Sequence, residues 1–437
     1  MAPIAKALDV ETSKAVADYY AGQGVLGFPV PPVAASDAKK LAVGRDLARY
    51  GDWEGRHLPA CVQCHGPAGR GAGSTFPPLA GQGATYISAQ LKAWQQGERK
   101  GDPLHLMKAV ADKLTVDEID AVAAWYGAST AGGAVRDELT NVVADLKPTD
   151  SHALKPAPDG FLPPPRSAYP EGEFGDSVRR GEAIFTATNR HPASAEFVGN
   201  DQQCGNCHVG EGRLPHAAPM WASWVAYPAY RGKNKKVNTF IERVQGCFDY
   251  SMNAQASKQG HAPAADSEAI VDLNSYFFWL SKGAPTGDSK MPGRGFPKLA
   301  DTDQGFDPER GAVVYAAKCQ LCHGADGKGL NVGGGVVFPP LWGSMSYNWG
   351  AGMHNINKAA GFIKANMPLG QPNSLSDQQA WDVAAYINSF DRPQDPRFTG
   401  DLAETTAKFH GKKYDYYGKR KGADGKLLGT VSPQGGK

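Results

Sequence analysis

The sequence predicts an all-α protein made of three small helical domains in tandem, joined by loop-rich connections. Three observations support this prediction. The motif Cys-x-x-Cys-His occurs three times in the 437 residues, and glycine and proline are abundant, with 53 and 32 residues. An amphipathic helix pattern follows each motif at a similar distance. The length suits about three domains of ordinary size, and the many turn-forming residues favour short helices separated by loops.

The three motifs predict the cofactor. They lie at 61–65, 204–208 and 319–323 and contain six of the seven cysteines. In this pattern two thiols form thioethers with a haem and the adjacent histidine supplies an axial nitrogen to the iron. A zinc site would need a second cysteine pair for each motif, which the sequence lacks. We therefore expect three covalently bound haem c groups in three class I cytochrome c-type domains. The attachment residues are Cys61, Cys64, Cys204, Cys207, Cys319 and Cys322, with His65, His208 and His323 as ligands.

Charge and hydropathy exclude other classes. The net charge is only +2, so no overall field favours nucleic acid or a membrane surface. The apolar stretches, such as 276–280, are far shorter than the roughly 18 residues of a membrane span. The first residues lack the pattern of a secretory signal. Because bacterial haem c attachment takes place outside the cytoplasm, we expect a mature form of a periplasmic protein.

Repeats predict the domain boundaries. Helix patterns at 114–126 and 375–387 open with a Thr or Ser cap, 266–280 is the counterpart in the middle, and 8–20 aligns without gaps with 114–126. A Phe-Pro-Pro-Leu sequence follows the first and third motifs, at 76–79 and 338–341. We expect a closing helix of a preceding cytochrome unit at 1–35, cytochrome c domains at 36–130, 176–290 and 291–395, a Pro-rich linker at 131–175, and a polar, solvated tail at 396–437.

Methionine is the expected sixth ligand in the outer two domains. Met107 follows His65 by 42 residues and Met367 follows His323 by 44. A matching position in two repeats favours this pair over Met345 and Met353, which are alternatives in the third domain. A thioether ligand favours ferrous iron and raises the potential, which suits electron transfer.

The middle domain offers two sulfur atoms. Met252 lies 44 residues after His208 and Cys247 lies 39 after it. Spacing favours Met252, but only ligation by Cys247 explains the seventh cysteine. A thiolate would stabilise ferric iron. Alternatively, Cys247 is a small buried hydrophobic residue, and spacing and cysteine count together leave the choice open.

A basic segment precedes this cysteine. The run 231–236 contains four basic residues. If 238–251 is helical, Arg243, Cys247 and Ser251 share one face at i, i+4 and i+8. A cation, a sulfur and a hydroxyl near iron would suit a small anion. The alternative is a solvated basic face with Arg243 in a surface ion pair.

Several segments of 170–412 carry a family resemblance. They are 199–200, 204–208, 218–222, 227–231, 242–247, 251–253, 338–343, 346–353 and 366–368. On these segments the chain resembles the diheme thiosulfate dehydrogenases, which form tetrathionate. The part before about 130 looks like the second half of a diheme electron-acceptor cytochrome that partners such enzymes, through 61–71, 79–82 and 90–91.

The resemblance implies the roles of the middle domain. It implies a catalytic haem ligated by His208 and Cys247, so that Cys247 outranks Met252. It also implies that Arg243 and Ser251 line the substrate pocket, with a further basic residue that matches Lys233 or Arg231. Some relatives carry a lysine directly before the ligating methionine. That position is Asn366 here, and Lys364 is a poor substitute.

The implied reaction is oxidation of two thiosulfates to tetrathionate with release of two electrons. We expect the electrons to pass through the Met367 haem to the Met107 haem and on to a downstream soluble cytochrome or other carrier. One alternative is a triheme electron carrier without a substrate. Another is a haem-dependent sulfur transferase of the Sox type, which the fused cytochrome disfavours because it supplies an exit for electrons.

Overall fold

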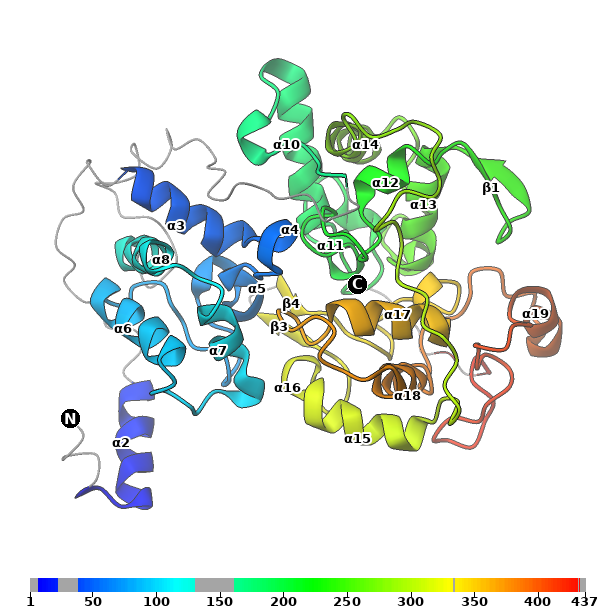
Figure 1. Cartoon of the computed structure of the whole chain (residues 1–437). Helices are drawn as coiled ribbons and strands as arrows, with labels where there is room; N and C mark the ends of the chain where they lie inside the picture. The colour runs from blue at the N-terminus through cyan, green and yellow to red at the C-terminus, as the bar shows by residue number, and fades with distance from the viewer. Residues whose placement is uncertain (1–6, 23–37, 130–160, 333–334, 431, 433–437) are drawn as a thin grey trace.

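The computed structural model describes residues 7–22, 38–129, 161–332, 335–430 and 432. Helices dominate it, as predicted, and they form three units that are wound in chain order (Figure 1). We call 38–129 the first unit, 161–290 the middle unit, 291–395 the third unit and 396–430 the tail. Among the helices described, none is both long and apolar enough to cross a membrane.

Each unit is a set of short helices around its Cys-x-x-Cys-His motif. The first unit contains α3 (Ala38–Tyr50), α4 (Trp53–Arg56), α5 (Cys61–His65), η2 (Pro67–Gly69), α6 (Ala84–Gln95), η3 (Pro103–His105), α7 (Leu106–Ala111) and α8 (Val116–Ala128). The middle unit contains η5 (Arg166–Ala168), α10 (Gly172–Thr186), η6 (Ala195–Phe197), α11 (Cys204–Cys207), α12 (Met220–Trp224), β1 (Ala229–Arg231), β2 (Lys236–Asn238), α13 (Phe240–Tyr250), η7 (Ala254–Ala256) and α14 (Glu268–Leu280). The third unit contains α15 (Pro308–Lys318), α16 (Gln320–His323), β3 (Leu330–Val332), β4 (Gly335–Phe338), η8 (Gly352–His354), α17 (Ile356–Asn366) and α18 (Asp377–Ile387), and the tail contains α19 (Leu402–Phe409).

The first and last long helices of each unit cross in close contact: α3 with α8, α10 with α14, and α15 with α18. A glycine lies at each crossing. A Cβ atom at Gly44, Gly181 or Gly311 would lie 2.1, 2.1 or 2.0 Å from a backbone oxygen of the facing helix. These three glycines therefore permit a helix approach that any side chain would prevent. The repeated crossing gives the three units the same scaffold.

The predicted closing helices are confirmed. Thr115 caps α8 and Ser376 caps α18, each in a reciprocal capping box with the third helical residue. In the middle unit Ser267 precedes α14 without a side-chain cap bond. The amphipathic patterns thus form helices, as predicted.

Two antiparallel ribbons were not predicted. In β1–β2, Ala229 pairs with Asn238 and Arg231 with Lys236, so the basic run forms a hairpin. In β3–β4, Leu330 pairs with Phe338. Strands of three or four residues are too short to show a hydrophobic period, which is why an all-α reading missed them. The fold remains mostly helical.

The linker is shorter than predicted, whereas the N-terminal repeat forms the expected helix. Helix α10 begins at Gly172, inside the segment expected to be a linker, whereas 130–160 lie outside the described residues. The N-terminal repeat forms α2 (Val10–Gly22), on which Val10 and Val16 are exposed. Residues 1–6 and 23–37 lie outside the described residues.

The tail is not simply solvated, as the sequence suggested. His410 and Tyr417 are fully buried and Leu428 is nearly so. Trp349 of the third unit shares a cluster with Tyr417 and Leu428. A few buried side chains thus hold a mostly polar segment against the third unit. The sequence did not indicate them because the segment as a whole is polar.

The first unit is fixed to the other two. Trp53 packs with the hydrophobic core of the third unit and against Gly210 of the middle unit. Arg213 of the middle unit forms a buried ion pair with Glu54. In Figure 1 the β3–β4 ribbon lies beside α5, and the two are in contact.

Candidate active site

The three motif histidines share one hydrogen-bonding arrangement. Their Nδ1 atoms lie 2.7, 2.6 and 2.9 Å from the carbonyl oxygens of Pro77, Ala218 and Pro339, for His65, His208 and His323 in that order. A carbonyl only accepts, so each Nδ1 carries the proton and each Nε2 keeps a lone pair for a metal. The residues fit the haem that the motifs predict.

A proline follows each of these carbonyls, namely Pro78, Pro219 and Pro340. The Phe-Pro-Pro-Leu repeat of the outer units therefore has a structural explanation, because its first proline supplies the acceptor. Sequence comparison missed the middle counterpart, since Ala218-Pro219 shares only the second proline of the pattern.

The middle unit contains an apolar cavity beside its motif. The space between its lining atoms is about 590 Å³, open solvent included. Both thiols of the motif and His208 line it, together with Cys247 and Ser251. The other lining side chains are mostly apolar and include Phe185, Met220, Val244, Phe248, Phe277 and Met353. A flat apolar cofactor with polar chemistry at its centre suits this lining.

Cys247 is chemically unlike the other cysteines. Burial raises the pKa of the six motif thiols to about 11 or 12. Burial also acts to raise the pKa of Cys247, but the positive charge of Arg243 and a smaller contribution from His208 outweigh it and lower the pKa to about 6. The Nη1 of Arg243 donates to Sγ of Cys247 over 2.8 Å. The structure therefore favours a thiolate that faces the histidine.

Met252 also lines this cavity. Its side chain is only 2% exposed and belongs to the hydrophobic cluster of the middle unit. It thus already has the packing role expected of a core methionine. No comparable feature of charge or hydrogen bonding distinguishes its sulfur among the described contacts.

Helix α13 presents the predicted residues. It begins after Thr239, whose capping box with Glu242 fixes its start, and it continues through Gly246 to Tyr250. Arg243 and Cys247 are one turn apart on it, as predicted. Ser251 is its C-terminal cap, just beyond the last helical residue.

The third unit anchors the end of this helix. Asn348 Nδ2 donates to the carbonyl of Asp249 over 2.9 Å, and the backbone N–H of Asn348 donates to Tyr250 O. Asn200 Nδ2 donates to the carbonyls of Ser251 and Ser346, over 2.8 and 2.9 Å. The segment 346–353 therefore positions Ser251 at the cavity, a role that its sequence did not reveal.

A cluster of cations surrounds the site. Arg231 ends β1 and Lys233 lies in the turn of the hairpin. The ammonium of Lys233 lies 3.3 Å from the ring centroid of Tyr250 and donates to the carbonyl of Gly350. Burial, followed by the charges of Arg397, Arg243 and Arg231, lowers the pKa of Lys233 to about 6. Several cations held close together form a preorganised anion site.

Two members of this cluster were missed from the sequence. Arg397 pairs with Asp395 and lies 5.4 Å from the centroid of Tyr250. The pKa of Lys358 is lowered by burial and then by Lys412, Arg243 and Arg231. Both residues come from outside the middle unit, and only tertiary packing brings them to the site.

The outer motifs face one another. Phe76 and Phe338, the first residues of the two Phe-Pro-Pro-Leu sequences, are in contact with ring centroids 5.1 Å apart. Cys64 and Cys322 pack against the same small hydrophobic cluster. The outer two motifs therefore adjoin across the interface between the first and third units.

The two predicted methionines lie against the hydrophobic cores of their own units. Met107 packs against the core of the first unit and Met367 against that of the third. Lys364 donates to the carbonyl of Leu375 over 2.6 Å and pairs with Asp377, so its ammonium is already engaged. Among the alternatives, Met353 lines the middle cavity instead.

Comparison with known proteins completes the description. The cytochrome c family pattern matches residues 54–126, and the pattern of cytochrome c oxidase, cbb3-type, subunit III matches 306–387. The chain is 52% identical to a thiosulfate dehydrogenase of Thiomonas intermedia (strain K12) over 271 residues, which are 62% of this chain and 83% of the relative. It is 48% identical to a thiosulfate dehydrogenase electron acceptor of Stutzerimonas stutzeri (strain A1501) over 128 residues, which are 29% of this chain and 56% of the relative.

A solved structure resembles almost the whole chain. It is the thiosulfate dehydrogenase TsdBA of Marichromatium purpuratum in its as-isolated form. The identity is 50%, the TM-score is 0.88, and the match covers 99% of this chain and 86% of the other. The likeness therefore includes the arrangement of the three units.

Proposed function

The chain belongs to the thiosulfate dehydrogenase family, in the form fused to its electron-acceptor cytochrome, and from this premise we propose which residues perform the reaction. Family membership decides among the three functions considered from the sequence. The chain is an enzyme, neither a plain electron carrier nor a Sox-type transferase. The reaction joins two thiosulfates into tetrathionate and releases two electrons.

Substrate binding is assigned to Arg243, Arg231 and Lys233. Two thiosulfate dianions repel each other, and they meet only where fixed positive charge offsets that repulsion. Guanidinium groups suit the oxygens of a sulfonate because they donate two parallel hydrogen bonds. Ser251 lines the cavity of the middle unit beside Cys247, and its hydroxyl supplies a neutral donor.

The chemical step is assigned to Cys247. Its thiolate, supported by Arg243, bonds the terminal sulfur of one thiosulfate and two electrons leave. The terminal sulfur of a second thiosulfate then attacks that sulfur, which releases tetrathionate and restores the thiolate. Thiosulfate carries no proton at neutral pH, so the step needs no general base. The observation that supports this assignment best is the 2.8 Å contact of Arg243 with Cys247, a residue that lines the cavity together with His208.

Three covalently attached haem c groups would supply the one-electron chemistry and the route for electrons. We propose that the six motif cysteines attach these groups. The proposed pairs of iron ligands are His208 with Cys247, His323 with Met367, and His65 with Met107. The contact of Phe76 with Phe338 brings the last two pockets together. The proposed route therefore runs from the middle unit through the third to the first.

Compartment and partners follow from this chemistry. Haem c attachment in bacteria supports a periplasmic location. The partners are thiosulfate, tetrathionate and a downstream electron carrier that takes electrons from the first unit.

Replacement of the cysteine tests the assignment. We expect Cys247→Ala to lose tetrathionate formation from thiosulfate with an artificial electron acceptor. Met252→Leu is the matched control, because it removes the competing sulfur at similar volume, and it should keep the activity. Equal tetrathionate formation by wild type and Cys247→Ala would contradict the proposal. An electron paramagnetic resonance signal of the middle haem that changes in Met252→Leu but not in Cys247→Ala would also contradict it.

A further inference from the structure

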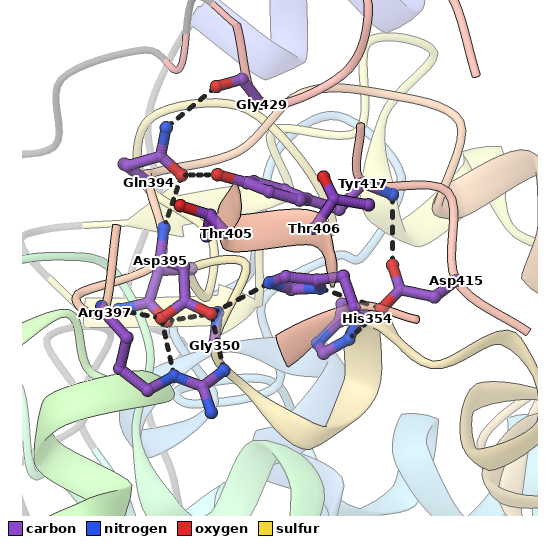
Figure 2. Close-up of polar contacts among 12 residues, drawn as sticks. Gly350, His354, Gln394, Asp395, Arg397, Thr405, Thr406, Asp415, Tyr417 and Gly429 are labelled. Atoms are coloured by element: carbon purple, nitrogen blue, oxygen red, sulfur yellow. Dashed lines mark hydrogen bonds and ion pairs between the residues drawn. The ribbon is translucent and has the colours of Figure 1, made fainter. Parts of the chain in front are cut away.

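A buried polar cluster lies away from the active site, where the tail meets the third unit. It consists of His354, His410 and Asp415, which are 5%, 0% and 2% exposed. Asp415 Oδ2 lies 3.0 Å from His354 Nε2 and 2.8 Å from His410 Nδ1. One ligand atom from each residue lies within 4.8 Å of the others. Figure 2 shows His354 and Asp415 directed toward each other.

The remaining ring nitrogens are already engaged by acceptors. His354 Nδ1 lies 2.5 Å from the carbonyl of Ala351, and His410 Nε2 lies 3.0 Å from Asp395 Oδ2. A carbonyl and a carboxylate both accept, so each of these two nitrogens carries a proton, which is the only proton of the ring when the imidazole is neutral. Lone pairs then remain on His354 Nε2 and His410 Nδ1. Both point at an oxygen of Asp415 that has no proton to give.

Three lone-pair atoms directed at one point need positive charge between them. One additional proton on His410 would let this ring donate to both Asp395 and Asp415, but His354 Nε2 would still face Asp415 Oδ2. A second proton would make two imidazolium ions whose ring centroids are 5.0 Å apart in a buried site. A single divalent cation gives the same charge at the point where the three atoms converge. Buried lone pairs that face each other without either would be costly.

The surroundings match those of a metal site. Histidines that bind metals usually donate their other N–H to a backbone carbonyl or a carboxylate, as His354 does to Ala351 and His410 to Asp395. The side-chain amide of Asn355 lies 3.2 Å from His354 Nε2. As placed, this amide nitrogen also donates to the carbonyl of Gly352 over 3.3 Å, and only a flip that gives up that hydrogen bond would turn the amide oxygen toward the site as a fourth ligand.

We propose that His354, His410 and Asp415 form a structural site for a divalent transition metal, for which zinc is the best match. Imidazole nitrogen and carboxylate oxygen are ordinary zinc ligands, whereas calcium and magnesium prefer oxygen alone. The site fastens the tail onto η8, directly before α17. Asp395 continues the connection to Arg397, which lies over Tyr250 beside the substrate cations.

The metal content of the haem-loaded, full-length protein tests this proposal. Elemental analysis should find one zinc per chain, after purification or after incubation with zinc sulfate and desalting. X-ray absorption at the zinc edge should show only nitrogen and oxygen neighbours at about 2.0–2.1 Å. A sulfur shell at about 2.3 Å would place the zinc on motif cysteines and overturn the proposal.

Two variants separate the ligands from their surroundings. Asp415→Asn and His410→Ala should reduce bound zinc from one per chain to none. Tyr417→Phe is the matched control, because Tyr417 bonds Gln394 through its hydroxyl but offers no ligand, and it should keep one zinc. If a ligand variant does not fold, the zinc content and absorption spectrum of the wild type still decide. Wild type with less than about one tenth of a zinc per chain after incubation would overturn the proposal and leave a hydrogen-bonded network.

Discussion

Lys233 should make substrate binding depend on pH. Its ammonium lies against the ring of Tyr250 and has one acceptor, the carbonyl of Gly350. Burial and nearby arginines lower its pKa to about 6. In the free enzyme at pH 7 only about one tenth of the molecules therefore carry the charge. Bound dianions favour the charged form and raise this pKa, so binding takes up a proton.

The size of the effect follows from the shift. Above pH 6 the substrate binds well only to the molecules in which Lys233 is protonated, and this fraction falls about tenfold for each pH unit. KM for thiosulfate should therefore rise by up to about tenfold per unit between pH 6 and the pKa of the bound state. Below pH 6 the lysine is already charged and KM should stop changing on its account.

The assay is KM and kcat between pH 5.5 and 8.5, with calorimetry in buffers of different ionisation enthalpy to count protons. Lys233→Arg is the matched control, since arginine stays charged throughout. Its KM should vary less with pH, and it should bind fewer protons with substrate than the wild type. Identical pH profiles and identical proton counts in the two proteins would refute the argument.

Three further substitutions have defined outcomes. Gly350→Ala would place a Cβ 2.4 Å from the ring of Tyr250; we expect a loss of about 1–3 kcal/mol in denaturation experiments, together with a raised KM, and an unchanged KM would contradict this coupling. Arg213→Met leaves Glu54 buried without its partner and should cost about 3–5 kcal/mol; adding Glu54→Leu should recover part of that stability, and no recovery would argue against the ion pair. Phe338→Ala removes a ring from the contact between the first and third units and should cost about 3–5 kcal/mol of folding stability. Stopped-flow absorbance should show that electrons reach the first unit more slowly, while KM for thiosulfate stays unchanged. An unchanged rate of electron transfer would exclude this contact from the route.

Local patterns were sufficient for the scaffold. The closing helices were predictable because Thr115 and Ser376 begin amphipathic repeats, and the face shared by Arg243 and Cys247 because one helix contains both. Haem c was predictable from the motifs because the chemistry of haem attachment fixes the spacing of the two cysteines and the histidine. Each of these features depends on residues close together in the sequence.

The rest of the site depends on contacts between distant segments. Arg397 approaches Tyr250 across 147 positions, and only the packing of the third unit and the tail brings it there. Asn348 anchors the end of α13 in the same way. The tail looked solvated because lysines outnumber its buried side chains, although His410 and Tyr417 are fully buried. Composition averages over a segment and so conceals a few decisive contacts.

The insertion of Trp53 between the other two units changes the kinetics of electron exit. A separate acceptor must collide with its donor in a suitable orientation, and the frequency of such encounters depends on concentration and on salt. Here donor and acceptor are held in one orientation, so the exchange is intramolecular, and its rate should not change when the protein is diluted. Only the final delivery to a carrier remains subject to diffusion.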